Sequence, residues 1–301
     1  MRCAGLDIGG TKIEVQVFDQ DWQAVARHRV PTPKDYEALV AAVAGQIAWA
    51  DAGAGPLDAV GVGAAGLVNP ETRLALTANL PATGKPFPAD IARAAGRQIT
   101  YINDCRALAL SEAVCGAGQG HRTVMALILG TGIGGGIAVD GSLLPGPMGM
   151  GGEFGHIAAP AHLVAAHDLP VFTCGCGRRG CIETYVAGPG LERLALHMTG
   201  RKMTAPEIAA ARDGDCRDVW ALWLELAAEL LHTLTLIADP DVIVLGGGLS
   251  SVTGITDDLR AAAAKVQIGD FGTVPIVPAQ GGDASGARGA AIAAWAEHKN
   301  G

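Results

Sequence analysis

The sequence has no excess of basic residues and no long apolar run. It contains 22 Lys and Arg against 30 Asp and Glu, a net charge of −8, so no basic stripe is available for nucleic acid. The longest uncharged run, 123–139, holds five glycines and is typical of a strand, a turn and a second strand. We therefore expect neither a nucleic-acid partner nor a membrane span.

Asp7 interrupts the apolar N-terminus, which argues against a secretory signal peptide. Charged residues make up only 17% of the 301 residues and apolar ones 49%, a composition that predicts a globular chain long enough for two domains. Outside one cluster, the cysteines at 3, 105, 115 and 216 are scattered singly. This pattern is typical of a reduced, cytoplasmic protein.

Apolar periodicity predicts alternating strands and helices along the chain. Expected strands are 3–8, 13–18, 25–30, 59–63, 100–102, 124–129, 135–139 and 242–245. Expected helices are 35–50, a short one after 88, 105–114, 217–238 and 286–297. Strands that alternate with helices indicate an α/β fold.

The opening pattern of strand, Gly/Thr turn and strand returns weakly at 124–139, which suggests an internal repeat at the head of each half. The glycine-rich 116–120 predicts the boundary between them. We expect an N-terminal α/β domain at 1–116 and a larger domain at 117–283. A C-terminal helix at about 284–301 is expected to pack back on the first domain.

Three thiols lie within eight residues, at Cys174, Cys176 and Cys181, and His156 precedes them. Three cysteines and one histidine form a closed structural zinc site, and such a site would position the flanking Glu153 and Glu183. The alternative is a group of buried or disulfide-bonded cysteines, although thiols spaced Cys-x-Cys rarely pair. We predict structural Zn²⁺ in a domain that carries this motif.

Two glycine-rich turns connect predicted strands, and both suit phosphate binding. Glycines let backbone N–H groups approach phosphate oxygens; the predicted contacts are Asp7, Gly9, Gly10, Thr11 and Lys12 in the first turn, and Gly130, Thr131, Gly132 and Gly134 in the second. The alternative is a pair of hairpin turns without a ligand. Two copies together with Gly247 and Gly248 favour nucleotide binding.

Asn103 and Asp104 follow a predicted strand, where open α/β sheets place ligands. Asp104 is also at the start of a predicted helix, so it is either a helix N-cap or a general base that takes a proton from a substrate hydroxyl.

Five motifs occur in one chain: Asp7-x-Gly-Gly-Thr-Lys12, Asn103-Asp104, the Gly130–Gly136 turn, Glu153-x-Gly-His156 and the cysteine motif ending at Glu183. Together they resemble the ROK family of sugar kinases over nearly the whole chain. The resemblance implies a two-domain actin-like (ribonuclease H-like) sugar kinase fold, with ATP and sugar in a cleft between the domains. It also implies ATP, Mg²⁺ and Zn²⁺, a small-molecule sugar substrate and a homodimer.

The resemblance further implies that Asp104 is the base for the sugar 6-hydroxyl. Asn103, Glu153, His156 and Glu183 would hold the other hydroxyls, with Gly66 and Asn79 in the sugar pocket. His156 would bind zinc through one ring nitrogen and the sugar through the other.

Within the family, the chain resembles members that phosphorylate N-acetylglucosamine. Cys105-Arg106 stands where an Ala-Asn pair is usual, and Ala65 where a proline often precedes Gly66. Glucose, fructose and N-acetylmannosamine therefore remain alternative substrates. A sugar-responsive repressor is a further alternative, but it would carry a DNA-binding helix-turn-helix for which there is no room before Asp7.

Overall fold

A computed structural model of the chain describes residues 1–77 and 79–300 and has the α/β fold expected from the sequence. The strands are β1 Cys3–Ile8, β2 Lys12–Phe18, β3 Ala24–Pro31, β4 Ala59–Ala64, β5 Leu67–Val68, β6 Ala75–Leu76, β7 Thr100–Asn103, β8 Thr123–Leu129, β9 Ile133–Val139, β10 Ser142–Leu143, β11 Val242–Gly246 and β12 Ile276–Pro278. The helices are α1 Tyr36–Ala54, α2 Phe87–Ala95, α3 Asp104–Cys115, α4 Ala161–Ala166, α5 Glu183–Val186, α6 Gly188–Thr199, α7 Ala205–Ala210, α8 Arg217–Ala238, α9 Ile255–Ala263 and α10 Ser285–Asn300. Short 3₁₀ turns are η1 Phe154–His156, η2 Gly248–Ser251 and η3 Gly282–Ala284.

Each predicted strand and helix is present, within a few residues of its expected ends. The short helix expected after 88 is α2, which already begins at Phe87. Pro88 does not prevent this, because the first turn of a helix needs no N–H from proline. The elements α4 to α7, α9, β5, β6, β10 and β12 were not predicted. Most of them are short, and a short element leaves little periodicity to detect.

The internal repeat is confirmed by the order of the strands. One sheet has the order β3-β2-β1-β4-β7 and another β10-β9-β8-β11-β12. In each, the opening strand pairs with the strand after its glycine-rich turn, and parallel strands follow on its other side. The two turns therefore occupy equivalent positions in the two sheets.

The chain divides into two compact units. Unit 1 comprises 1–120, 136–151 and 280–301, and unit 2 comprises 121–135 and 152–279. Unit 1 thus includes 136–151, which the expected division assigned to the second domain. The boundary at 116–117 stays a prediction.

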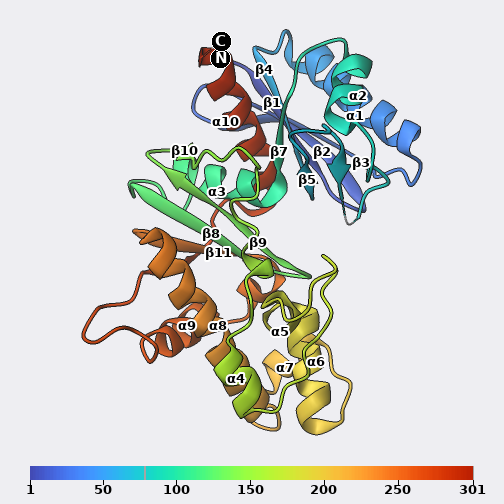
Figure 1. The fold of residues 1–301 in the computed structure, drawn as a ribbon. Helices are drawn as coiled ribbons and strands as arrows, with labels where there is room; N and C mark the ends of the chain where they lie inside the picture. The colour runs from blue at the N-terminus through green and yellow to red at the C-terminus, as the bar shows by residue number, and fades with distance from the viewer. Residues whose placement is uncertain (78, 301) are drawn as a thin grey trace. The chain divides into compact units, whose positions relative to one another are not determined.

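In unit 1, helices cover both faces of the first sheet (Figure 1). Ala4, Leu6 and Ile8 of β1 belong to the core that includes residues of α1 and α2. On the opposite face α10 packs directly on β1 and β4. A Cβ on Gly5 would lie 1.7 Å from the Ala287 oxygen, so only glycine allows this close approach.

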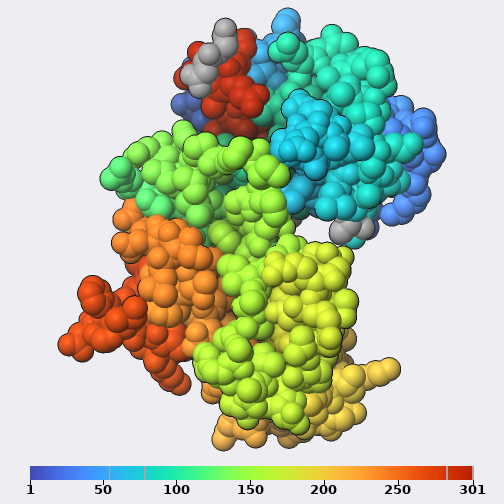
Figure 2. Space-filling view, viewed as in Figure 1, coloured from blue at the N-terminus to red at the C-terminus, as the bar shows by residue number. Residues whose placement is uncertain are grey.

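In unit 2, α8 packs against α5, α6, α7 and α9. The Trp223 indole of α8 is buried and donates to the Val186 oxygen at 2.9 Å. Among the described residues, α8 is the one helix long and apolar enough to cross a membrane, a test that buried core helices also pass. Figure 2 shows the segment between α9 and β12 projecting from the surface of unit 2; its Phe271 is 78% exposed.

Candidate functional site

Asp104 is the first residue of α3, and Asn103 is the cap of that helix. The Asn103 Oδ1 accepts hydrogen bonds from the backbone N–H groups of Cys105 at 3.0 Å and Arg106 at 3.2 Å. The Asn103 amide also donates to the Gly66 oxygen at 3.1 Å. The capping role considered for Asp104 therefore belongs to Asn103.

Burial raises the pKa of the Asp104 carboxyl above its ordinary value, and the Cys105 N–H partly offsets this. A carboxylate with a raised pKa accepts a proton more readily, as a general base requires. The sequence did not single out its neighbour Tyr101. The Tyr101 hydroxyl is buried and has no hydrogen-bond partner among the described residues, and burial and then the Asp104 charge raise its pKa.

The turn between β1 and β2 carries the first predicted phosphate contacts. The Gly9 N–H donates to the Lys12 oxygen at 2.9 Å, and the Thr32 hydroxyl of the following segment donates to the Gly9 oxygen at 2.7 Å. Asn79, an expected sugar contact, lies against this turn, because a Cβ on Gly10 would be 3.1 Å from its Cβ. At the end of β1, a Cβ on Gly286 would meet the Asp7 carboxyl at 2.9 Å.

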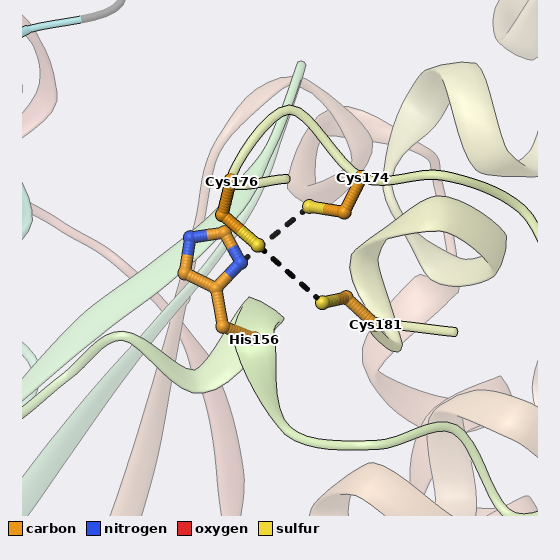
Figure 3. Close-up of side chains that lie close together, drawn as sticks. All are labelled: His156, Cys174, Cys176 and Cys181. Carbon is orange, nitrogen blue, oxygen red and sulfur yellow. Dashed lines mark hydrogen bonds between the residues drawn. The ribbon is translucent and has the colours of Figure 1, made fainter. Parts of the chain in front are cut away.

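In unit 2, the four predicted metal ligands come together. One ligand atom from each of His156, Cys174, Cys176 and Cys181 lies within 4.8 Å of the others. Figure 3 shows the imidazole and the three thiols pointing toward one another. The loop folds back because Gly177 and Gly180 take φ values of 86° and 74°, which favour glycine.

These distances fit a zinc site and not a disulfide. The sulfurs of Cys176 and Cys181 are 3.7 Å apart, and the Cys174 sulfur is 3.6 Å from His156 Nδ1. A tetrahedral zinc with ordinary bond lengths would place two sulfurs about 3.8 Å apart and a sulfur and nitrogen about 3.6 Å apart. A disulfide would need about 2.0 Å, and all seven cysteines are free.

Two acids flank this cluster. His156 Nε2 lies 3.6 Å from Glu153 Oε2, whereas its Nδ1 faces the thiols and is 3.8 Å from Glu183 Oε1. The buried Cys174 thiol donates to Glu183 Oε1 at 2.9 Å, and burial raises the pKa of that thiol. The ring of His156 therefore presents its two nitrogens to different partners.

Glu183 also joins the cluster to the second glycine-rich turn. Its Oε2 accepts the Ile133 N–H at 3.3 Å, and a Cβ on Gly132 would lie 3.2 Å from the same oxygen. These residues are about fifty positions apart in the sequence, so no local pattern could predict the contact.

The second turn borders a pocket of about 640 Å³ in unit 2, a size typical of small-molecule sites. Gly130, Thr131 and Gly248 line it, as expected for nucleotide contacts. Gly247 packs over the end of β8, where a Cβ would lie 2.4 Å from the Leu129 oxygen. Gly132 and Gly134 do not line the pocket.

Other pocket residues were not predicted from the sequence. They come from the N-terminal half of α6, from α7 and the residues just after it, and from η2 and the segment that follows, and include Gly188, Pro189, Glu192, Pro206, Arg212 and Leu249. The Gly188 N–H donates to the Gly130 oxygen at 2.8 Å, which fixes the start of α6 beside the turn. The available sequence signal for the start of α6 was the Gly188-Pro189 pair, because proline is common in the first turn of a helix.

Comparison with known proteins identifies the family of the chain. The ROK family model matches residues 3–297. The chain is 42% identical over 96% of its length to the N-acetylgalactosamine kinase AgaK of Shewanella sp. (strain ANA-3), covering 95% of that protein. It is 40% identical to an N-acetyl-D-glucosamine kinase of Escherichia coli O1:K1, and the aligned region covers 96% of this chain and 97% of the relative. A ROK hexokinase structure from Thermus thermophilus superposes with a TM-score of 0.89 at 33% identity, over the full length of both chains.

Proposed function

Because the chain belongs to the ROK family, we propose that it is a kinase that transfers the γ-phosphoryl group of ATP to the 6-hydroxyl of N-acetyl-D-glucosamine. The observation that carries the proposal is the state of Asp104: the neighbouring Asn103 caps the helix, and burial raises the Asp104 pKa. A carboxylate in this state suits a general base for a sugar hydroxyl.

N-acetyl-D-galactosamine is the second candidate substrate, because the relative of 42% identity is named for it. The two sugars share a 2-acetamido group and differ in configuration at C4. Both relatives therefore support a 2-acetamidohexose, whereas glucose and fructose lack this group.

We assign the sugar hydroxyls to Gly66, Asn79, Asn103, Glu153, His156 and Glu183, with Asp104 taking the proton of the 6-hydroxyl. The ATP phosphates are assigned to the turn at 7–12 and to the turn at 130–134, together with Gly247 and Gly248. Mg²⁺ bound with ATP would neutralise charge on the transferred group, and the protein would mainly position the reactants.

We further propose that His156, Cys174, Cys176 and Cys181 hold a structural Zn²⁺. Zinc binds cysteine as thiolate, and a thiolate has no proton to donate to Glu183. Metal binding would thus leave Glu183 Oε1 available to a sugar hydroxyl. The expected setting is the cytoplasm, where ATP is available and thiols stay reduced, with no nucleic-acid or membrane partner.

A panel of sugars with ATP and Mg²⁺ tests the proposal. ADP release is followed with N-acetylglucosamine, N-acetylgalactosamine, N-acetylmannosamine, glucose and fructose, and NMR locates the phosphate on the product. We expect the highest kcat/KM with N-acetylglucosamine and a 6-phosphate product. A higher kcat/KM with glucose or fructose would overturn the substrate assignment, and no turnover with any sugar would overturn the kinase assignment.

A further inference from the structure

A second pocket, of about 260 Å³, lies in unit 1 beside the predicted base. It runs along β7, the last strand of its sheet. Gly66 and Asn103, two expected sugar contacts, form part of its wall. The pocket therefore adjoins the place where the sugar is expected.

Its walls are held by hydrogen bonds that do not require a ligand. Asn103 donates to the Gly66 oxygen, and the Thr100 hydroxyl donates to the Glu297 carboxylate at 2.5 Å. Gly66 has a φ of 112°, and a Cβ there would lie 2.2 Å from the Leu76 oxygen. The shape of the pocket is therefore built into the fold.

Arg106 supplies a cationic donor to this pocket. It follows Asp104 by two residues on α3, and its Nη1 lies 3.4 Å from the Gly149 oxygen, a long contact. A Cβ on Gly136 would lie 3.0 Å from the Arg106 Cα, so β9 packs closely on this turn of α3. The first turn of the helix, and with it the start of the Arg106 side chain, is held in place.

The remaining lining indicates what the pocket would take. Leu67, Val68 and Leu143 present aliphatic surface, and Glu297 places a carboxylate in the same wall. A carboxylate disfavours an anionic ligand, so the arginine suits a neutral acceptor such as a carbonyl oxygen. A carbonyl joined to a small alkyl group is an acyl group.

We propose that this pocket receives the 2-acylamino substituent of the sugar, with the Arg106 guanidinium donating to the acyl oxygen and Leu67, Val68 and Leu143 contacting the alkyl end. This inference rests on the proposed function and assigns Arg106 as a specificity-determining residue. The pocket is larger than an acetyl group, so the enzyme also accepts longer N-acyl chains.

The experiment compares N-acetylglucosamine with glucose, which lacks the substituent. Arg106→Ala should lower kcat/KM for N-acetylglucosamine by roughly 10- to 100-fold, the effect of losing a charged hydrogen bond. The kcat/KM for glucose, or its competitive inhibition constant where turnover is too slow to follow, should change less than about threefold. Arg106→Lys keeps a cationic donor, so its kcat/KM for N-acetylglucosamine should lie between those of wild type and Arg106→Ala. The control is Arg93→Ala, at an exposed arginine of the same unit, and its kcat/KM should match that of wild type.

A second variant tests the pocket without touching Arg106. Val68→Phe fills space at the alkyl end, so it should reduce kcat/KM for N-butanoylglucosamine at least about tenfold more than for N-acetylglucosamine. If Arg106→Ala lowers kcat/KM equally for glucose and N-acetylglucosamine, Arg106 only supports the Gly149 segment. If Val68→Phe lowers kcat/KM equally for both acyl sugars, the substituent binds elsewhere. Either result overturns the inference. If the wild-type enzyme prefers sugars without a 2-acylamino group, the proposed substrate itself is wrong. Failure of the proposed function can therefore be distinguished from failure of the pocket assignment.

Discussion

At the scale of single residues, Asn103 takes the capping role that the sequence left open for Asp104. Asn103 satisfies the N–H groups of the first turn of α3, and Asp104 has a pKa raised by burial. The sequence identified the pair but left open whether Asp104 was a cap or a base. The hydrogen bonds that Asn103 accepts from the first turn, together with the burial of Asp104, favour the base.

Asp104→Asn should lower kcat at least about 100-fold and leave the sugar KM nearly unchanged, because an amide keeps the shape but cannot accept the proton. Steady-state kinetics with N-acetylglucosamine measures both constants. Asp21→Asn, at an exposed turn, is the matched control. A kcat close to wild type in folded Asp104→Asn would remove the residue from the mechanism.

The raised pKa of Asp104 also predicts how stability and activity depend on pH. The folded state binds this proton more tightly than the unfolded state, so ionising Asp104 costs folding free energy as the pH rises through its folded-state pKa. Asp104→Asn should therefore unfold at the same or a higher temperature than wild type at pH 8, and the difference should shrink toward pH 5. Thermal unfolding at the two pH values measures this.

The same shift should move the acid limb of wild-type kcat/KM above the ordinary carboxyl value of about 4. An acid limb at or below about 4, or an asparagine variant clearly less stable at pH 8 than wild type, would contradict the direction of the shift.

At the scale of elements, the cysteine loop and the Gly130–Ile133 turn are connected through Glu183. Cys176→Ser should lower the zinc content below one per chain. It should also weaken sugar affinity at least about tenfold, because the metal site no longer positions Glu153 and Glu183. ATP affinity should fall by less, since the hydrogen bond that Glu183 accepts from this turn comes from the Ile133 N–H and not from one of the predicted ATP contacts. Elemental analysis and calorimetric titration with each ligand measure these effects.

Cys216→Ser is the matched control, because Cys216 is buried outside the cluster. It should retain zinc and both affinities. Active wild-type enzyme without zinc, or ordinary sugar affinity in Cys176→Ser, would contradict a structural metal.

Helix α3 also contains a fully buried carboxylate that holds other segments of unit 1. Glu112 accepts hydrogen bonds from the N–H groups of Ala117, Gln280 and Gly281 and from the Ser285 hydroxyl, at 2.7–3.1 Å. Glu112→Ala should lower the free energy of unfolding by at least about 2–3 kcal/mol, because it leaves several buried donors unpaired.

Chemical denaturation measures this loss, and Glu37→Ala, at an exposed position in the first turn of α1, should cost far less. Equal stabilities of the two variants would show that the donors find other partners.

At the scale of the whole molecule, we expect a homodimer. On α8, Leu236 is 60% and Ile237 69% exposed, and association that covers them would remove apolar surface from water. Sedimentation equilibrium should give twice the chain mass of 30.5 kDa. The mass of a single chain at tens of micromolar protein would contradict the prediction.

The repeated sheet order shows which features of the whole molecule sequence patterns could predict. Both glycine-rich turns were identified from local composition, and the structure places them at equivalent positions in the two sheets. The pocket beside the second turn was only partly predicted, because its other walls come from α6, α7 and the segment after η2. Those residues carry no shared motif.

By itself, the sequence determined the features that depend on neighbours along the chain. Period-two and helical spacing identified the main elements. The cysteine spacing with its glycines predicted that Cys174, Cys176 and Cys181 come together, because a short loop can bring such residues together. Only the tertiary structure decided the contacts between distant segments. The approach of Gly5 to Ala287, the bond from Ile133 to Glu183 and the pocket around Arg106 depend on how whole elements pack, and packing leaves no periodic trace in any one segment.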